Sequence, residues 1–108
     1  MQDRRRSKRY GVDVEGIVRS EGGIARKATI SNLSVEGCRL SVSDRRFASG
    51  TTLTVGLGPI GLLHAKVVWR IGQVHGLSFD QVLHPAVLDQ IRTFLSHEPA
   101  LIEERPAA

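Results

Sequence analysis

The chain has 108 residues, of which 41% are hydrophobic and 24% are charged, the size and balance of one globular domain with a single core. No apolar run approaches the roughly 20 residues that a membrane-spanning helix needs. No apolar segment follows the basic N-terminus, as one would in a secretory signal. The single cysteine, Cys38, excludes an internal disulfide. These features predict a cytoplasmic protein without membrane insertion.

The net positive charge is concentrated at the N-terminus. Residues 1–10 carry five basic side chains and one acidic side chain, and their net charge of +4 equals that of the whole chain. Residues 1–9 also lack apolar periodicity, so we expect them to form a flexible basic arm that attracts phosphate groups. Residues 98–108 are expected to form a polar tail.

Between these ends, residues 10–97 are expected to form one domain. Short segments of strand-like alternation recur between turns that contain glycine. The predicted strands are residues 10–19, 24–33, 38–42, 51–57, 62–70 and 74–80. Several short strands joined in this way are typical of an antiparallel β-barrel, and closing the sheet removes its exposed edges.

The alternation also predicts which side chains are buried. In the second strand, Ile24, Ala28 and Ile30 share one face, together with the polar Asn32. Cys38 alternates with apolar residues of the third strand and is expected to be a small buried hydrophobe. Of the aromatic residues, Trp69 and Phe79 fall in apolar runs and are expected in the core.

After His84 the period changes to that of a helix. Pro85 suits the first helical position, and a stripe of apolar residues follows at helical spacing. The stripe consists of Val87, Leu88, Ile91, Phe94 and Leu95. We therefore expect an amphipathic helix at about residues 85–96 that caps the barrel.

Residues 32–37 form a polar turn between the second and third strands. Asn32 and Ser34 are two positions apart, so in an extended chain they project to the same side and make a small polar face at the rim of the sheet. Gly37 suits a backbone position with a positive φ that closes the turn. Alternatively, both polar side chains bond only to local backbone, as in Asx and Ser turns, which is compatible with ligand binding.

Arg5 and Arg9, together with Asn32, Ser34 and Gly37, resemble the two-part signature of the PilZ family, whose members bind the bacterial second messenger cyclic di-GMP. The two motifs lie about 25 residues apart, and their combination is more specific than either alone. The resemblance extends to residues 50–53, 67–70 and 74–79. It implies a six-stranded antiparallel β-barrel with a C-terminal helix, a receptor that is not an enzyme, and no cofactor apart from the ligand.

The resemblance also implies roles for the residues of the motifs. Arg5 and Arg9 are expected to close over the ligand, because guanidinium groups pair with both phosphate and guanine. Asn32 and Ser34 would meet a guanine edge or a phosphate from the barrel, while Gly37 holds the turn. The family's turn often begins with Asp, and Asn32 offers one accepting oxygen where a carboxylate could accept two hydrogen bonds, which predicts a weaker base contact.

Two further arginines are candidates for the site. In relatives, the residue at the position of Arg4 is associated with holding one ligand or a stacked pair, and an arginine there could stack on an extra guanine. Arg39, just past the turn, could add positive potential. The resemblance suggests that ligand binding orders the arm and relays the messenger level to an effector protein, in processes such as motility, exopolysaccharide synthesis and biofilm formation.

Other interpretations of the sequence remain open. The chain could be a PilZ-like protein-interaction module without nucleotide binding, although such members generally lack both motifs, or the basic run could be a solvated tail. A nucleic-acid-binding barrel is less favoured, because aromatic residues make up only 5% of the chain and most fall in core-like positions. The four histidines show no metal-ligand spacing, and no catalytic triad is indicated.

Overall fold

The structure is a computed structural model that describes residues 8–96. Its strands are β1 (Tyr10–Ser20), β2 (Arg26–Leu33), β3 (Gly37–Ser41), β4 (Thr52–Gly56), β5 (Leu62–Ile71) and β6 (Val74–Phe79). A 3₁₀ turn, η2 (Gly58–Ile60), joins β4 to β5, and helix α1 (Pro85–Gln90) continues into a π-helical turn, η3 (Ile91–Leu95). Within the described residues, no helix is long and apolar enough to cross a membrane.

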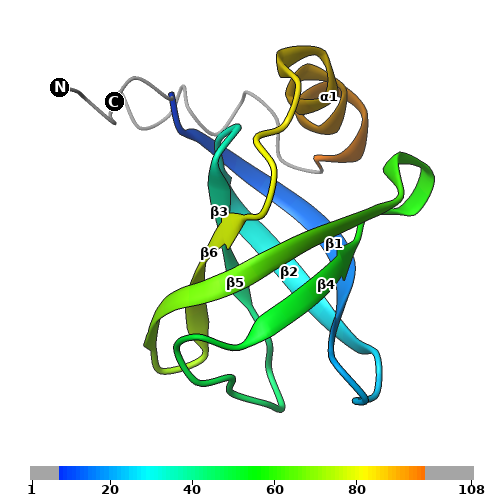
Figure 1. Cartoon of the computed structure of the whole chain (residues 1–108). Helices are drawn as coiled ribbons and strands as arrows, with labels where there is room; N and C mark the ends of the chain where they lie inside the picture. The colour runs from blue at the N-terminus through cyan, green and yellow to red at the C-terminus, as the bar shows by residue number, and fades with distance from the viewer. Residues whose placement is uncertain (1–7, 97–108) are drawn as a thin grey trace, which may run out of the picture.

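The six strands form a closed antiparallel barrel in the order β1-β2-β3-β6-β5-β4, with β4 paired back to β1. The predicted fold class is therefore confirmed. The β1–β2, β3–β4 and β5–β6 connections lie together at one end of the barrel, which we call the loop end, and α1 lies at the opposite end, the helix end (Figure 1). Inward side chains of all six strands fill the interior, and Cys38 and Phe79 are among them, as predicted.

The C-terminal helical segment closes the helix end of the barrel. His84 caps α1 by accepting a hydrogen bond from the backbone N–H of Ala86 at 3.0 Å, and Leu88 and Ile91 are buried against the core. The guanidinium of Arg92 lies 3.9 Å from the centroid of the Tyr10 ring, a cation–π contact. These contacts fix the segment to the first residues of β1.

The predicted apolar stripe of this helix is wrong at Phe94, whose side chain is 76% exposed. The expectation assumed an α-helix throughout residues 85–96, but from Ile91 onward the backbone takes the wider π-helical turn. A wider turn advances each side chain by a smaller angle. Phe94 therefore no longer lies on the face that carries Leu88 and Ile91.

The start of the second strand also differs from the prediction. Ile24 was expected on the inner face, but β2 begins at Arg26 and the side chain of Ile24 is 73% exposed. Gly22 has a φ of +72°, and the N–H of Gly23 donates to the carbonyl of Ser20 at 2.9 Å. The connection between the strands therefore includes Ile24, and the chain pairs with β1 only from Arg26 onward.

The β2–β3 connection is held from inside by Ser34. Its side chain is completely buried (0% exposed), and its Oγ accepts hydrogen bonds from the backbone N–H groups of Glu36 and Gly37 at 3.1 and 3.2 Å. The N–H of Ser34 donates to the carbonyl of Gly37 at 2.9 Å. The alternative of a local Ser turn therefore describes this residue.

Gly37 is required for a different reason from the one predicted. It is not among the described glycines with a positive φ. Instead, a Cβ at this position would lie 2.1 Å from the carbonyl oxygen of Leu77, in the neighbouring strand β6, where Gly37 pairs with Ser78. The glycine lets the two backbones approach each other at the start of β3.

A buried histidine organises the loop end. His75 on β6 is fully buried, and its Nε2 accepts a hydrogen bond from the backbone N–H of Phe47 at 3.0 Å. Its Nδ1 lies 3.4 Å from the carbonyl oxygen of Leu40, so the neutral ring carries its proton on Nδ1. Burial, and to a lesser extent the charge of Arg70, lower the pKa of His75 below 6.5.

The first prediction concerns the pH dependence of stability. Because the pKa of His75 is lowered in the folded state, the unfolded chain takes up its proton first as the pH falls below about 6.5. The free energy of unfolding should therefore be highest above that pH and should decrease between pH 6.5 and pH 5. Urea unfolding at pH 8 and pH 5 would show this, and His75→Gln should flatten the dependence. If the free energy of unfolding fell by the same amount between pH 8 and pH 5 in His75→Gln, the pH dependence would arise from other groups.

The second prediction tests the close approach at Gly37. Gly37→Ala should lower the free energy of unfolding by about 2–3 kcal/mol, because the methyl group displaces the backbone of β6. Gly11→Ala is the matched control, since a Cβ there meets no atom within 4 Å, and it should change stability by less than about 1 kcal/mol. Urea denaturation of both variants measures the difference, and equal effects would contradict the packing argument.

Candidate functional site

Three β-bulges change which side chains face out of the barrel. The register shifts between Gly11 and Val14 on β1, between Ile30 and Asn32 on β2, and between Val67 and Trp69 on β5. In each case the named strand carries one more residue than its partner, which reverses the alternation of the following side chains. Asn32 and Trp69 share the parity of buried residues and nevertheless leave the core.

The bulges create one row of cross-strand neighbours on the outer wall. Gly11 pairs with Asn32, Asn32 with Arg39, Arg39 with Gly76, and Gly76 with Trp69. We call these five residues the outer row. Directly paired residues share a face of the sheet, and four steps of about 4.8 Å give the row a length of roughly 19 Å.

At one end of the outer row, the two predicted motifs meet. Arg9 Nε donates a hydrogen bond to Asn32 Oδ1 at 2.7 Å, across 23 positions of sequence. The amide oxygen therefore orients the guanidinium of Arg9 over the wall of the barrel. This contact leaves the NH₂ groups of the guanidinium available for an anion or a base edge.

At the other end of the row lies an exposed aromatic side chain. Trp69 is 39% exposed, and the guanidinium of Arg39 lies 6.0 Å from the centroid of its ring. The indole covers Gly76 so closely that a Cβ on Gly76 would lie 2.2 Å from Trp69 Nε1. The absence of a side chain at Gly76 therefore allows the indole to pack directly on the backbone of β6.

The expectation that Trp69 belongs to the core was wrong, because the bulge on β5 turns it outward. The alternation itself could not reveal this, because Val67 and Trp69 are two positions apart and would share the inner face of a regular strand. The glycine at position 76 lies opposite the tryptophan only in the shifted register.

The remaining predicted site residues have different positions. Ser34 lies behind the turn instead of sharing a polar rim with Asn32, because the chain leaves the extended conformation after Leu33. Gly37 lies beneath the turn at the start of β3. Arg39 lies in the outer row, beside Asn32, where its charge adds positive potential. Arg4 and Arg5 fall outside the described residues, as does most of the expected arm.

The outer row lies on the outer face of the barrel wall. A surface hollow of about 690 Å³ lies elsewhere on the barrel, lined by residues such as Ile17, Lys27, Thr29 and Leu62 and by none of the outer row. In the part of the chain that is described, no group of three or more metal-ligating side chains is present. Burial raises the pKa of Cys38 to about 12, so this thiol is not a nucleophile at neutral pH.

Comparison with known proteins gave several similar solved structures and one family. No curated protein matches the chain. The fold is similar to that of YcgR from Escherichia coli, solved in complex with c-di-GMP, with a TM-score of 0.53 and 19% sequence identity. The similarity covers 97% of this chain and 48% of YcgR, so the chain spans about half the length of that protein.

The profile of the PilZ domain matches residues 3–97. This range contains both arginine positions of the N-terminal motif, the turn at residues 32–37 and the whole barrel. The closed six-stranded barrel with its C-terminal helical segment agrees with that assignment. The chain therefore belongs to the PilZ domain family.

Proposed function

We propose that this protein is a cytoplasmic receptor for cyclic di-GMP, and not an enzyme, that binds the ligand on the outer row with its N-terminal arm. The observation that carries this proposal is the 2.7 Å hydrogen bond between Arg9 and Asn32. It joins two motifs that are far apart in sequence. The function needs no cofactor and no metal.

The chemistry of the outer row fits the parts of the ligand. Cyclic di-GMP presents two phosphates and two guanines. The guanidinium groups of Arg9 and Arg39 can each pair with a phosphate or with guanine N7 and O6, and the indole of Trp69 offers a stacking face for a base. Asn32 would contribute by orienting Arg9 and by meeting a base edge.

Ser34 and Gly37 support the site indirectly in this proposal. Ser34 Oγ is occupied by the backbone of the turn, and Gly37 allows β3 to approach β6. Both residues therefore hold Asn32 and Arg39 at their places in the outer row. The motif would be required for binding even if Ser34 never touches the ligand.

The position of the outer row on the outer face of the barrel gives the arm its role. A ligand lying on a wall is covered by the barrel on one side only, so arginines from residues 4–9 would enclose it from the other side. Ligand binding would then order the arm against the barrel. The free energy of that ordering is what a downstream partner protein could sense.

The third prediction concerns binding of cyclic di-GMP, measured by calorimetry. Arg9→Ala should weaken binding on the order of 100-fold, because a charge-assisted hydrogen bond is lost. Arg5→Ala should have a similar effect. Arg9→Lys should lose part of the affinity, since lysine keeps the charge but not the planar fork. Two ligands per chain would support a stacking role for Arg4, and one ligand per chain would remove it.

The matched control is Arg19→Ala, an exposed arginine on β1 that pairs with Thr54 far from the outer row, and linear GMP serves as the control ligand. Unchanged affinity in both Arg5→Ala and Arg9→Ala would move the site away from the arm. No heat from the folded protein would favour a module that acts through protein contacts alone. Binding of single-stranded DNA that falls steeply with salt, without preference for guanine, would favour a nucleic-acid function.

The fourth prediction uses Trp69, the only tryptophan of the chain. Cyclic di-GMP should quench its fluorescence, and Trp69→Ala should weaken binding roughly tenfold, because stacking of a base is worth about 1–3 kcal/mol. Gly76→Ala should act similarly by displacing the indole. Phe94→Ala removes another exposed aromatic side chain and should not affect binding. Full affinity in Trp69→Ala would restrict the site to the Arg9 end of the row.

A further inference from the structure

The loop end of the barrel carries a cluster of arginines that the proposed ligand site does not use. Arg45 and Arg46 lie exposed in the β3–β4 connection, and Arg70 lies exposed at the end of β5. Ile71 follows Arg70 with its side chain 74% exposed. We call these four residues the arginine face.

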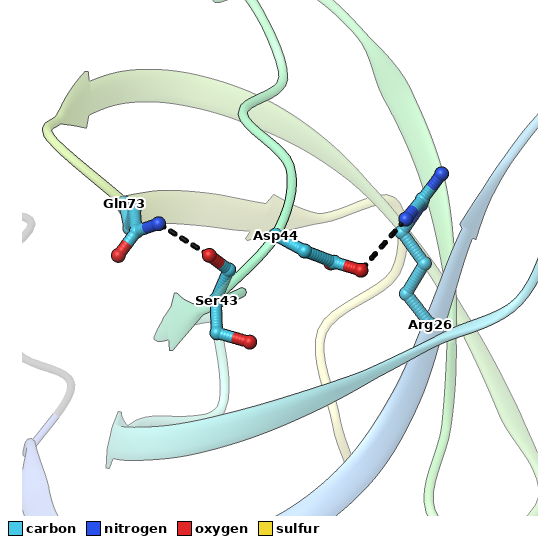
Figure 2. Close-up of polar contacts among 4 residues, drawn as sticks. All are labelled: Arg26, Ser43, Asp44 and Gln73. Carbon is cyan, nitrogen blue, oxygen red and sulfur yellow. Dashed lines mark hydrogen bonds and ion pairs between the residues drawn. The ribbon is translucent and has the colours of Figure 1, made fainter.

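Polar contacts tie the connections of the loop end together (Figure 2). Arg26, at the start of β2, forms an ion pair with Asp44 at 3.0 Å, and the side-chain amide of Gln73 donates to the backbone carbonyl of Ser43. The β3–β4 connection is thereby attached to the hairpins on both sides. The arginine face thus belongs to one fixed surface and not to separate loops.

Packing beneath this surface connects the β3–β4 connection, which carries Arg45, to the end of β5, which carries Arg70. The guanidinium of Arg45 lies 5.0 Å from the centroid of the Phe47 ring, and the Phe47 and His75 rings lie 5.6 Å apart. Arg70 pairs with His75 in the β5–β6 register, and its NH1 group donates to the carbonyl of Gly72 at 3.0 Å. Arg45 and Arg70 therefore flank the same buried pair of rings.

The positive charge of the arginine face is not balanced locally. Asp44 is neutralised by Arg26, and among residues 8–96 the ion pairs found are Arg26–Asp44 and Arg92–Asp89. Arginines next to an exposed aliphatic side chain are typical of protein interfaces. There the guanidinium groups pair with carboxylates of the partner, and the apolar side chain is covered.

We propose that the arginine face is a docking surface for an acidic segment of a partner protein, in which carboxylates alternate with aliphatic side chains. The carboxylates would pair with Arg45, Arg46 and Arg70, and an aliphatic residue would cover Ile71. This surface lies at the opposite end of the barrel from α1 (Figure 1), so docking there does not compete for Arg9 or Asn32.

A further acidic group of the loop end favours a peptide over an anionic membrane. Glu21 lies exposed in the β1–β2 turn. A flat anionic membrane would bring its negative charge against this carboxylate, since it contacts the whole loop end. A narrow acidic segment can follow the arginine face and avoid Glu21.

The test uses the full chain and a defined probe. A fluorescent ten-residue peptide of alternating Glu and Leu should bind, with backbone amide NMR shifts at residues 43–47 and 70–73. Arg46→Glu should weaken this binding at least about tenfold, because it places like charges together. Lys8→Glu makes the same change of net charge beside the N-terminal arm and should leave peptide affinity nearly unchanged.

Two further arms separate the alternatives. A peptide of alternating Glu and Ser should bind more weakly than the Glu–Leu peptide, and Ile71→Ser should remove that difference. Loss of binding in Lys8→Glu but not in Arg46→Glu would overturn the proposal in favour of the arm. The proposal would also be overturned if the unaltered protein bound the Glu–Leu peptide no more tightly than Arg46→Glu does. Binding of phosphatidylglycerol vesicles without binding of the peptide would overturn it as well. Cyclic di-GMP affinity of Arg46→Glu, measured in parallel, reports separately on the ligand site.

Discussion

A strand alternates its side chains strictly, so one additional residue changes the face of each side chain that follows it. In this barrel, three such residues act on β1, β2 and β5. The core is preserved on both sides of each bulge, while Asn32 and Trp69 are turned outward. The outer row depends on this change of register. Without the bulges, a polar amide would be buried without compensation, and the indole would compete for space inside a small barrel.

The two ends of the barrel are held by different sets of contacts, because an antiparallel barrel places successive strand connections at opposite ends. The helix end is anchored by the contact of Arg92 with Tyr10 and by the hydrogen bond from the Asp13 N–H to Ser96 Oγ at 3.0 Å. The arm that precedes Tyr10 therefore starts from a fixed point beside Asn32. The loop end is fixed by His75 and by the polar contacts around the β3–β4 connection. One small core thus supports two charged surfaces, which adjoin where Trp69 is followed by Arg70 on β5.

Most of the secondary structure could be predicted because the apolar alternation of the six strands is regular over most of their length. The predictions are wrong where the regular alternation or the helical period is interrupted. Ile24 was misplaced because a turn takes more residues than its glycines suggest, and Phe94 because a π-helical turn changes the helical period. Gly37 was correctly recognised as necessary but for the wrong reason. Its neighbour Leu77 is 40 positions away, and no local pattern reports such a contact.

The sequence by itself determined the fold class and the segregation of charge toward the N-terminus, and it indicated the motif residues of the ligand site that we propose. These are properties of local spacing and composition, which a single chain displays directly. Only the tertiary structure decided that Arg9 meets Asn32, that Ser34 is buried while Asn32 is not, that Trp69 lies on the wall beside Arg39, and that arginines of the β3–β4 connection and of β5 lie at the same end of the barrel. Each of these depends on strand register and on contacts between distant residues, which are set when the barrel closes.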